Sequence, residues 1–164
     1  MSARAAFQRG FTIIEIIVVV AIMGVLLTIA APSFVAYTAA QKVKTASFDL
    51  YAAMMFARSE AIKRRSTVTI TPVSSDWKNG WTIHATIAGV DTTLRTQDSL
   101  NGVIFSGATS VVYRLDGRLT SNSAVGVLIQ PETANSTIQN RCIRVDLTGL
   151  PKTTNLASTV TTCP

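Results

Sequence analysis

The feature that most constrains this chain is an apolar segment near its N-terminus. Residues 11–41 contain a single charged residue, Glu15, and 23 of these 31 residues are hydrophobic. The segment is long enough to supply the roughly 20 residues that a helix needs to cross a bilayer. Residues 42–164 hold 21 charged residues and have an ordinary composition. This division disfavours a plain soluble enzyme and a disordered basic tail, and it predicts a small globular head on one very apolar helix.

The flanks of this segment indicate its orientation. Arg4 and Arg9 precede it and no acidic residue does, so the positive-inside rule keeps the N-terminus cytoplasmic and sends the rest across the membrane. A buried core helix is disfavoured because the head, residues 66–164, is too small to enclose it. A cleaved secretory signal has the same basic start, but Ala30 and Ala31 lead into further helix rather than a polar mature start. We expect a retained anchor.

The start of the apolar segment carries a family resemblance. Gly10-Phe11-Thr12-Ile13-Ile14-Glu15 follows a short basic leader and resembles the class III signal of type IV pilins and type II secretion pseudopilins. The resemblance implies that a prepilin peptidase cuts between Gly10 and Phe11 and that Phe11 is then N-methylated. It also implies that Glu15 compensates the new N-terminal ammonium, of a neighbouring subunit, during assembly. Opposite charges attract strongly in a low dielectric, and each alone would be costly there.

The chain continues as helix beyond the apolar segment. Pro32 is expected to kink it or loosen one turn, because proline lacks an N–H and crowds the preceding turn; with Glu15 it is a candidate assembly residue. Residues 33–65 contain neither Gly nor Pro. From about residue 41 a 4-3-4-3-4 spacing predicts an amphipathic helix over 41–65 that packs on the head; its stripe is Val43, Ser47, Leu50, Met54, Ala57 and Ala61. The basic residues 63–65 end this helix. Their charges interact favourably with its C-terminal dipole, and Arg64 can form an ion pair with Glu60 one turn earlier.

The head is rich in Ser and Thr and alternates apolar and polar residues. Strands are predicted over 67–70, 81–87, 103–105, 111–115, 125–129 and 142–147, separated by the turn signals Asn79-Gly80, Asn101-Gly102 and Asp116-Gly117. Short strands at this spacing predict one or two antiparallel sheets laid against the helix. The fold class is therefore α+β: a long N-terminal helix, with a transmembrane half (11–40) and an amphipathic half (41–65), packed on a β-rich head (66–164).

Several head motifs resemble the GspH/FimT family of pilin-like proteins. They are the helix sequence 57–63, the turn Trp77-Lys78-Asn79-Gly80-Trp81 and the turn at Asp116-Gly117. The resemblance covers the whole chain, more strongly up to Trp81 than after it. Both tryptophans are expected to anchor the core beside a tight turn.

The two cysteines, Cys142 and Cys163, lie in the part predicted to be extracytoplasmic. An oxidising compartment allows them to form a disulfide, which would tie the last predicted strand to the C-terminus; two free thiols are the alternative. Zinc would need more ligands than these cysteines and the single histidine, His84, supply locally. His84 is expected to face solvent from its strand. No nucleophile elbow, phosphate loop or metal-ligand motif is present, so we expect no enzyme activity, cofactor or metal.

Three functions fit these features. The first, implied by the resemblance, is a minor type IV pilin near the pilus tip that helps to start assembly with other minor pilins and the major pilin. It would reside in the inner membrane with a periplasmic head, and then in the pilus on the cell surface. The second is a type II secretion pseudopilin of the GspH kind. Genomic neighbours would separate the two.

The third function is binding of double-stranded DNA, because some FimT-like pilins are associated with DNA uptake through a Gly-Arg-x-Arg turn. Here the corresponding residues read Gly149-Leu150-Pro151-Lys152, so that motif is mostly absent. Arg141, Arg144 and Lys152 still make the region basic, and phosphate binding needs only clustered cations. We expect Arg141 and Arg144, in one strand, to share one face of its sheet. Asp146 partly offsets their charge.

Overall fold

The computed structural model describes residues 11–164, apart from the side chains of Ile29 and Pro32. The predicted leader, 1–10, with Gly10, therefore lies outside the described residues. A boundary between Val35 and Ala36 separates two compact units of the chain.

One long helix, α1 (Ile13–Arg64), runs through both units. In the first unit its apolar side chains are exposed, as expected for a helix whose partners are lipid or other helices. Judged by length and composition, no uninterrupted helix among the described residues can cross a membrane by itself. Within α1, two stretches do satisfy the requirement for length and composition when they are counted together: Ile13–Thr28 and Ser33–Arg64. Pro32 lies within α1, and its effect on the helix remains a prediction.

In the second unit, α1 buries the stripe that the sequence predicts. All six residues of that stripe are at most 1% exposed: Val43, Ser47, Leu50, Met54, Ala57 and Ala61. The two alanines bring the helix close to the strands beneath it, because a methyl side chain adds little to the separation. The helix ends after Lys63 and Arg64, whose charges suit its C-terminal dipole, and Arg65 turns the chain with a φ of 50°.

Eight strands form two antiparallel four-stranded sheets, in the orders β3-β2-β1-β5 and β4-β6-β7-β8. The first sheet contains β1 (Val68–Pro72), β2 (Trp81–Ile87), β3 (Val90–Gln97) and β5 (Val111–Tyr113). The second contains β4 (Val103–Gly107), β6 (Val125–Pro131), β7 (Asn140–Val145) and β8 (Pro151–Leu156). Two short 3₁₀ turns, η1 (Val73–Ser75) and η2 (Trp77–Asn79), connect β1 to β2.

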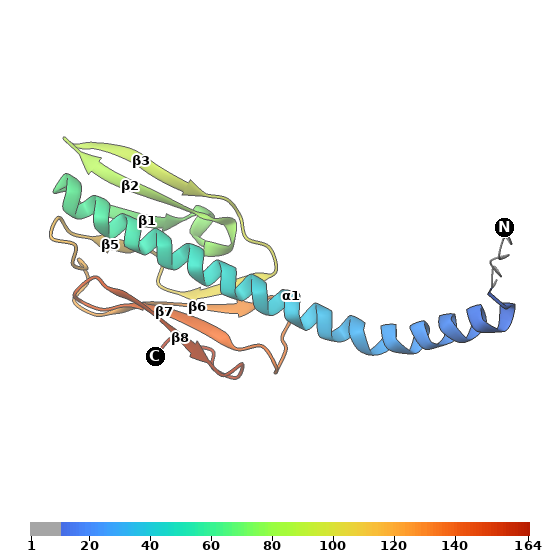
Figure 1. Ribbon diagram of the computed structural model, residues 1–164. Helices are drawn as coiled ribbons and strands as arrows, with labels where there is room; N and C mark the ends of the chain where they lie inside the picture. Colours follow the sequence, from blue (N-terminus) through green and yellow to red (C-terminus); the bar gives the residue numbers. More distant parts are fainter. Residues whose placement is uncertain (1–10) are drawn as a thin grey trace, which may run out of the picture. The chain divides into compact units, whose positions relative to one another are not determined.

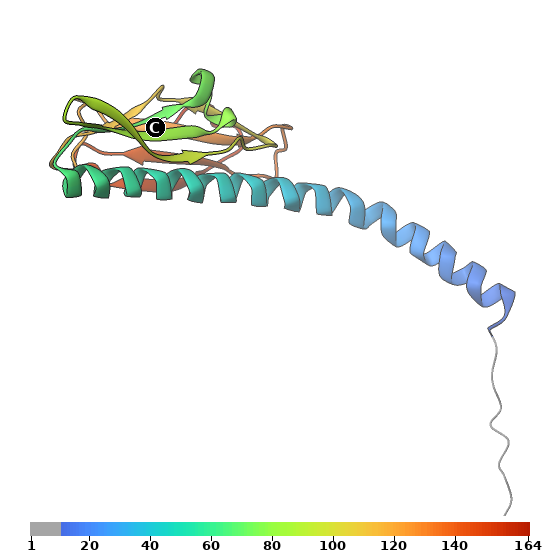
Figure 2. The ribbon, with the colours of Figure 1, turned by 90° about the horizontal axis from the view of Figure 1, so that it is seen from above.

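The second part of α1 lies across one face of both sheets (Figures 1 and 2), and a single apolar core joins the helix to the two sheets. Register accounts for this core: Ile70 is paired with Ile83 and Val111 in the first sheet. In the second, Val127 is paired with Ile143. Paired residues point to the same side of a sheet, so each set faces the helix together. The α+β fold expected from the sequence is confirmed.

Six strands match the predicted runs to within a few residues, whereas β3 and β8 were not predicted. Most β3 side chains are exposed, and four consecutive residues of β8 are, so neither strand alternates apolar with polar residues. Both are edge strands held by backbone pairing with one neighbour. Hydrophobic periodicity reports a buried face, and these strands lack one.

Near the end of α1, the mostly buried carboxylate of Glu60 forms an ion pair with Arg64. The carboxylate accepts a hydrogen bond from Arg64 Nε at 2.5 Å, and the Glu60 side chain is 10% exposed. The Arg64 guanidinium lowers the pKa of Glu60 below its ordinary value of 4.5. A lowered folded-state pKa stabilises the fold above the ordinary value, and this contribution disappears as the pH falls through the folded-state value.

We therefore expect the free energy of unfolding to fall less at acid pH in Glu60→Gln than in the wild-type chain. Denaturant unfolding at about pH 7 and about pH 3.5 should show a larger loss of stability in the wild-type chain than in the variant. Asp49→Asn, in the same helix, is the control and should follow the wild type. Equal losses in Glu60→Gln and wild type would show that the pair contributes nothing to acid sensitivity.

Candidate assembly site

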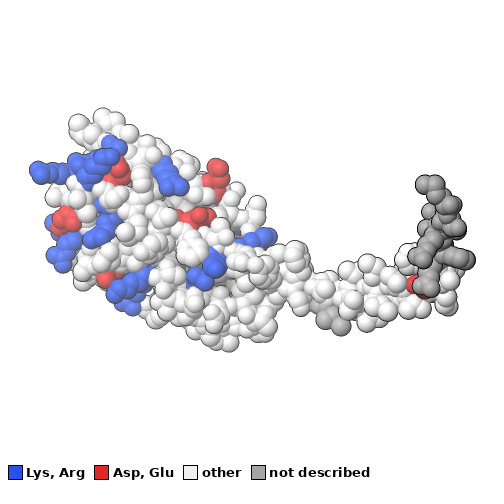
Figure 3. Space-filling view, in the orientation of Figure 1, with Lys and Arg blue, Asp and Glu red and all other residues white. Residues whose placement is uncertain are grey.

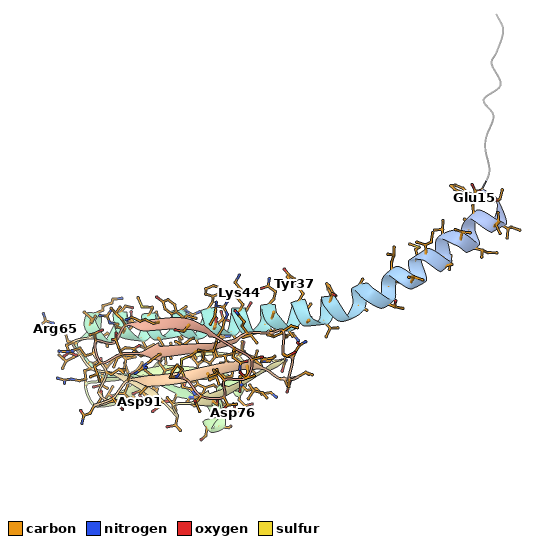
Figure 4. All side chains as sticks on the ribbon, turned by 90° about the horizontal axis from the view of Figure 1, so that it is seen from below. Glu15, Tyr37, Lys44, Arg65, Asp76 and Asp91 are labelled. Carbon is orange, nitrogen blue, oxygen red and sulfur yellow. A yellow bond between two sulfur atoms is a disulfide. The ribbon has the colours of Figure 1, made fainter. Side chains whose placement is uncertain are left out.

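The first turn of α1 contains the only charged residue of segment 11–41, Glu15, and holds it in a defined position (Figure 4). The Thr12 backbone N–H donates to Glu15 Oε2 at 2.8 Å, and the Thr12 hydroxyl donates to the same oxygen at 3.0 Å. In return, the Glu15 N–H donates to Thr12 Oγ1 at 3.3 Å. This is a reciprocal capping box, which satisfies free backbone donors at a helix start. The carboxylate is thus fixed at the N-terminal end of the helix, where the dipole also favours it.

Apolar side chains surround this carboxylate. A shallow hollow of about 330 Å³ is lined by Phe11, Ile14, Glu15, Val18 and Val19. Figure 3 shows that basic and acidic side chains gather on the head, while the N-terminal part of α1 is uncharged over nearly all its length. Within the described residues 11–41, Glu15 is therefore the only anionic group that can attract a cation. The role of Thr12 was not predicted, although the Thr-x-x-Glu spacing signals it.

In the head, both tryptophans have the structural role that the sequence predicts. Trp77 and Trp81 are 4% and 1% exposed, and their ring centroids are 6.1 Å apart. Trp77 Nε1 donates to the Ala108 carbonyl at 2.7 Å, which joins the turn before β2 to the chain between β4 and β5. These contacts tie the turn before β2 to the end of β4.

The C-terminal segment is held on the face of the second sheet that points away from α1. Cys142, in β7, forms a disulfide with Cys163, as the sequence allowed. Asn140 Nδ2 donates to the carbonyls of Ser158 and Val160, at 3.2 and 2.9 Å. The segment thus covers the outer face of β7, which leaves Cys142 only 2% exposed.

Replacing both cysteines by serine should lower the free energy of unfolding by about 3 kcal/mol, the value of the chain-entropy model for a loop of this size. Denaturant unfolding of the full chain in detergent measures it. The wild-type chain with reductant should lose a similar amount, whereas reductant should not affect the double variant. An unchanged midpoint in the double variant would contradict a stabilising role.

The three cations predicted for DNA binding do not form one surface, which corrects the expectation that Arg141 and Arg144 share a face. Arg144 lies three residues after Arg141 in β7. Because successive side chains of a strand alternate between faces, the two arginines point to opposite faces. Arg141 points towards α1, where its Nη1 is 3.5 Å from Ser47 Oγ. Arg144 points to the opposite face and donates to the Pro164 carbonyl at 2.6 Å. Lys152 is paired in register with Arg144, and its Nζ lies 3.9 Å from Asp146 Oδ2.

His84 lies on the outer face of the first sheet, where its ring contacts two neighbouring strands. Its Nδ1 is 2.7 Å from Asp91 Oδ1, and its Nε2 is 2.9 Å from Thr71 Oγ1. Its side chain is 27% exposed. The arrangement links β1, β2 and β3 on the face away from the core.

Comparison with known proteins agrees with this geometry. Residues 46–149 match the family described as type II transport protein GspH. The chain belongs to the GspH family. Residues 6–31 also match the prokaryotic N-terminal methylation motif, which indicates a prepilin-type N-terminal anchor and pilus assembly. The family consists of structural pilins and pseudopilins, so this GspH-family chain is not an enzyme and assembles with other pilins.

A fimbrial protein and a type IV pilin have sequences similar to that of this chain. A fimbrial protein of Pseudomonas aeruginosa is 28% identical over 135 residues, covering 81% of this chain and 84% of the relative. The type IV major alpha-pilin of Moraxella bovis is 26% identical over 129 residues, covering 78% and 81%. Both alignments extend over most of each protein.

Two solved structures share the fold. The type IV minor pilin FimU of Pseudomonas aeruginosa superimposes with a TM-score of 0.60 at 19% identity, covering 76% of this chain and 96% of FimU. The minor pseudopilin EpsH of the Vibrio cholerae type 2 secretion system gives 0.55 at 13% identity, covering 73% and 99%. At these identities the likeness is one of fold.

Proposed function

We propose that this chain is a minor type IV pilin that enters the fibre near its tip and helps to start assembly. The observation that carries the proposal is the carboxylate of Glu15, fixed by Thr12 at the start of an exposed apolar helix. Such a helix needs apolar neighbours, and its single anion needs a cation among them. The N-terminus of a neighbouring pilin, freed by cleavage, supplies that cation.

Processing and location follow from the same segment. A prepilin peptidase cuts between Gly10 and Phe11, and Phe11 becomes the methylated N-terminus. Before assembly the chain is anchored once in the inner membrane, with the head in the periplasm. The N-terminal methylation motif over residues 6–31 supports this processing, and the basic residues Arg4 and Arg9 support the orientation.

Deleting the gene in its source organism tests the role in assembly. We expect few or no surface fibres in electron micrographs, restoration by the full chain, and gold-labelled antibody at fibre ends. Label along whole fibres would contradict the tip position. Normal fibre numbers combined with a loss of secreted proteins would favour a type II secretion pseudopilin instead.

Binding of double-stranded DNA is the second candidate function, and one observation favours it. Arg144 and Lys152 lie opposite each other in register on the outer face of β7 and β8, so two cations are side by side there. A gel shift with the full chain in detergent at moderate salt tests it. The complex should weaken steeply with added salt, and absence of a shift at high micromolar protein would remove this function.

A further inference from the structure

One cluster on the head is not used by the functions above. The ring of Phe48, in α1, is 56% exposed. Lys44 Nζ lies 6.0 Å from the centre of this ring, and the guanidinium carbon of Arg141 lies 5.9 Å from it. Among the described residues, neither cation forms an ion pair with a carboxylate. Two like charges held against one ring repel each other, and an anionic group between them would be attracted by both.

This cluster separates two hollows between α1 and the second sheet. One, of about 390 Å³, includes Tyr37, Gln41 and Gln139; the other, of about 540 Å³, includes Phe48, Tyr51 and Thr153. Lys44 and Arg141 line the first hollow and Phe48 lines the second, so the three-residue cluster lies between the two hollows. Among the described residues, no Asp or Glu lines either hollow. Figure 4 shows Tyr37 and Lys44 on the first turns of α1 that belong to the second unit. We call this feature, from Tyr37 to Thr153, the α1–β8 trough.

One wall of the α1–β8 trough is an open sheet edge. β8 pairs with β7 without a register shift and with no other described strand. Its residues 152–155 are all exposed, and Pro151 removes a donor only at its first position. An edge strand of this kind offers backbone N–H and C=O groups to an added strand.

We propose that the α1–β8 trough binds an extended segment of a neighbouring pilin that carries a carboxylate. The segment pairs with the edge of β8, and its carboxylate lies between Lys44 and Arg141 over the ring of Phe48. Two unpaired cations match one or two carboxylates, whereas a nucleic acid would present a row of phosphates to a longer basic surface. This inference rests on assembly with other pilins, which keeps a neighbouring subunit permanently within reach.

Photo-crosslinking in living cells tests the proposal with the full chain. Phe48→p-benzoylphenylalanine and Thr153→p-benzoylphenylalanine place a probe on each wall of the trough. We expect both to capture the same acidic, extended segment of a pilin, identified by mass spectrometry in the membrane or fibre fraction. Leu115→p-benzoylphenylalanine is the control for exposure, because Leu115 is also 56% exposed. It should not capture that segment.

Charge reversal then tests whether capture depends on the cations of the trough or only on the positive charge of the head as a whole. Arg141→Glu should reduce capture from position 48 at least fivefold, while Arg144→Glu, on the opposite face of the same strand, should leave it unchanged. Capture of lipid, nucleic acid, a pilin segment without carboxylates, or nothing in either fraction would overturn the proposal. If the probe captures the pilin segment in the membrane fraction but the chain never enters fibres, the result would support the trough and contradict the proposed function.

Discussion

Glu15→Ala should remove this chain from assembled fibres. In the proposed assembly, the substitution leaves the N-terminal ammonium of a neighbouring subunit without its partner in an apolar surrounding. An uncompensated buried charge costs roughly 3–5 kcal/mol, which corresponds to more than about a hundredfold in an assembly equilibrium. Fibres sheared from cells expressing the variant should therefore contain almost none of it, while its amount in the membrane stays normal.

Two further variants separate the charge of Glu15 from its role in capping α1. Glu15→Gln keeps an oxygen that can accept from Thr12 but removes the charge, and it should fail like the alanine variant. Thr12→Val keeps the charge but removes the hydroxyl that contacts Glu15 Oε2 and the Glu15 N–H. It should cost only the value of a helix cap, about 1 kcal/mol. If Thr12→Val fails and Glu15→Gln assembles, the cap rather than the charge is what matters.

Asp49→Ala is the matched control for these variants, because it removes another carboxylate from α1, within the head. It should enter fibres normally. A similar loss in Asp49→Ala would indicate that assembly responds to the net charge of the helix and not to the position of Glu15.

Gly80→Ala should strongly destabilise the head, and more than Gly89→Ala does. Gly80 joins η2 to β2 with a φ of 91° and a ψ of −173°, a region that residues with a side chain rarely adopt. An added Cβ would lie 2.1 Å from the Gln97 carbonyl oxygen. That oxygen belongs to the backbone and cannot rotate away. Strain and overpacking together predict a loss of about 3–5 kcal/mol in the free energy of unfolding.

Gly89→Ala provides the matched control for Gly80→Ala. Gly89 also has a positive φ, 81°, but an added Cβ there would meet no atom within 4 Å. Only the conformational cost remains, about 1–2 kcal/mol. Urea unfolding of the full chain in detergent, followed by tryptophan fluorescence, measures both. Equal losses would show that the close approach to Gln97 is relieved by movement of the backbone.

The parts of this fold that could be predicted from the sequence are those with a strong local signal. The apolar segment, the 4-3 stripe from Val43 to Ala61 and the six half-buried strands each repeat with the period of one element. The site at Glu15 is equally local, because its partner Thr12 is three residues away. The role of Trp77 and Trp81 as core anchors was predicted from their place beside the Asn79-Gly80 turn.

Tertiary structure decided the rest, because it depends on groups that are distant in sequence. β3 and β8 form through backbone pairing with a neighbour, so their side chains carry no periodic pattern. Arg141 and Arg144 are close in sequence, yet strand geometry puts them on opposite faces, one against α1 and one against the C-terminal segment. The sequence by itself therefore determined that this chain is a helix-anchored subunit with an α+β head. Only packing of α1 against the second sheet placed Lys44, Phe48 and Arg141 together, because these residues come from two elements almost 100 positions apart.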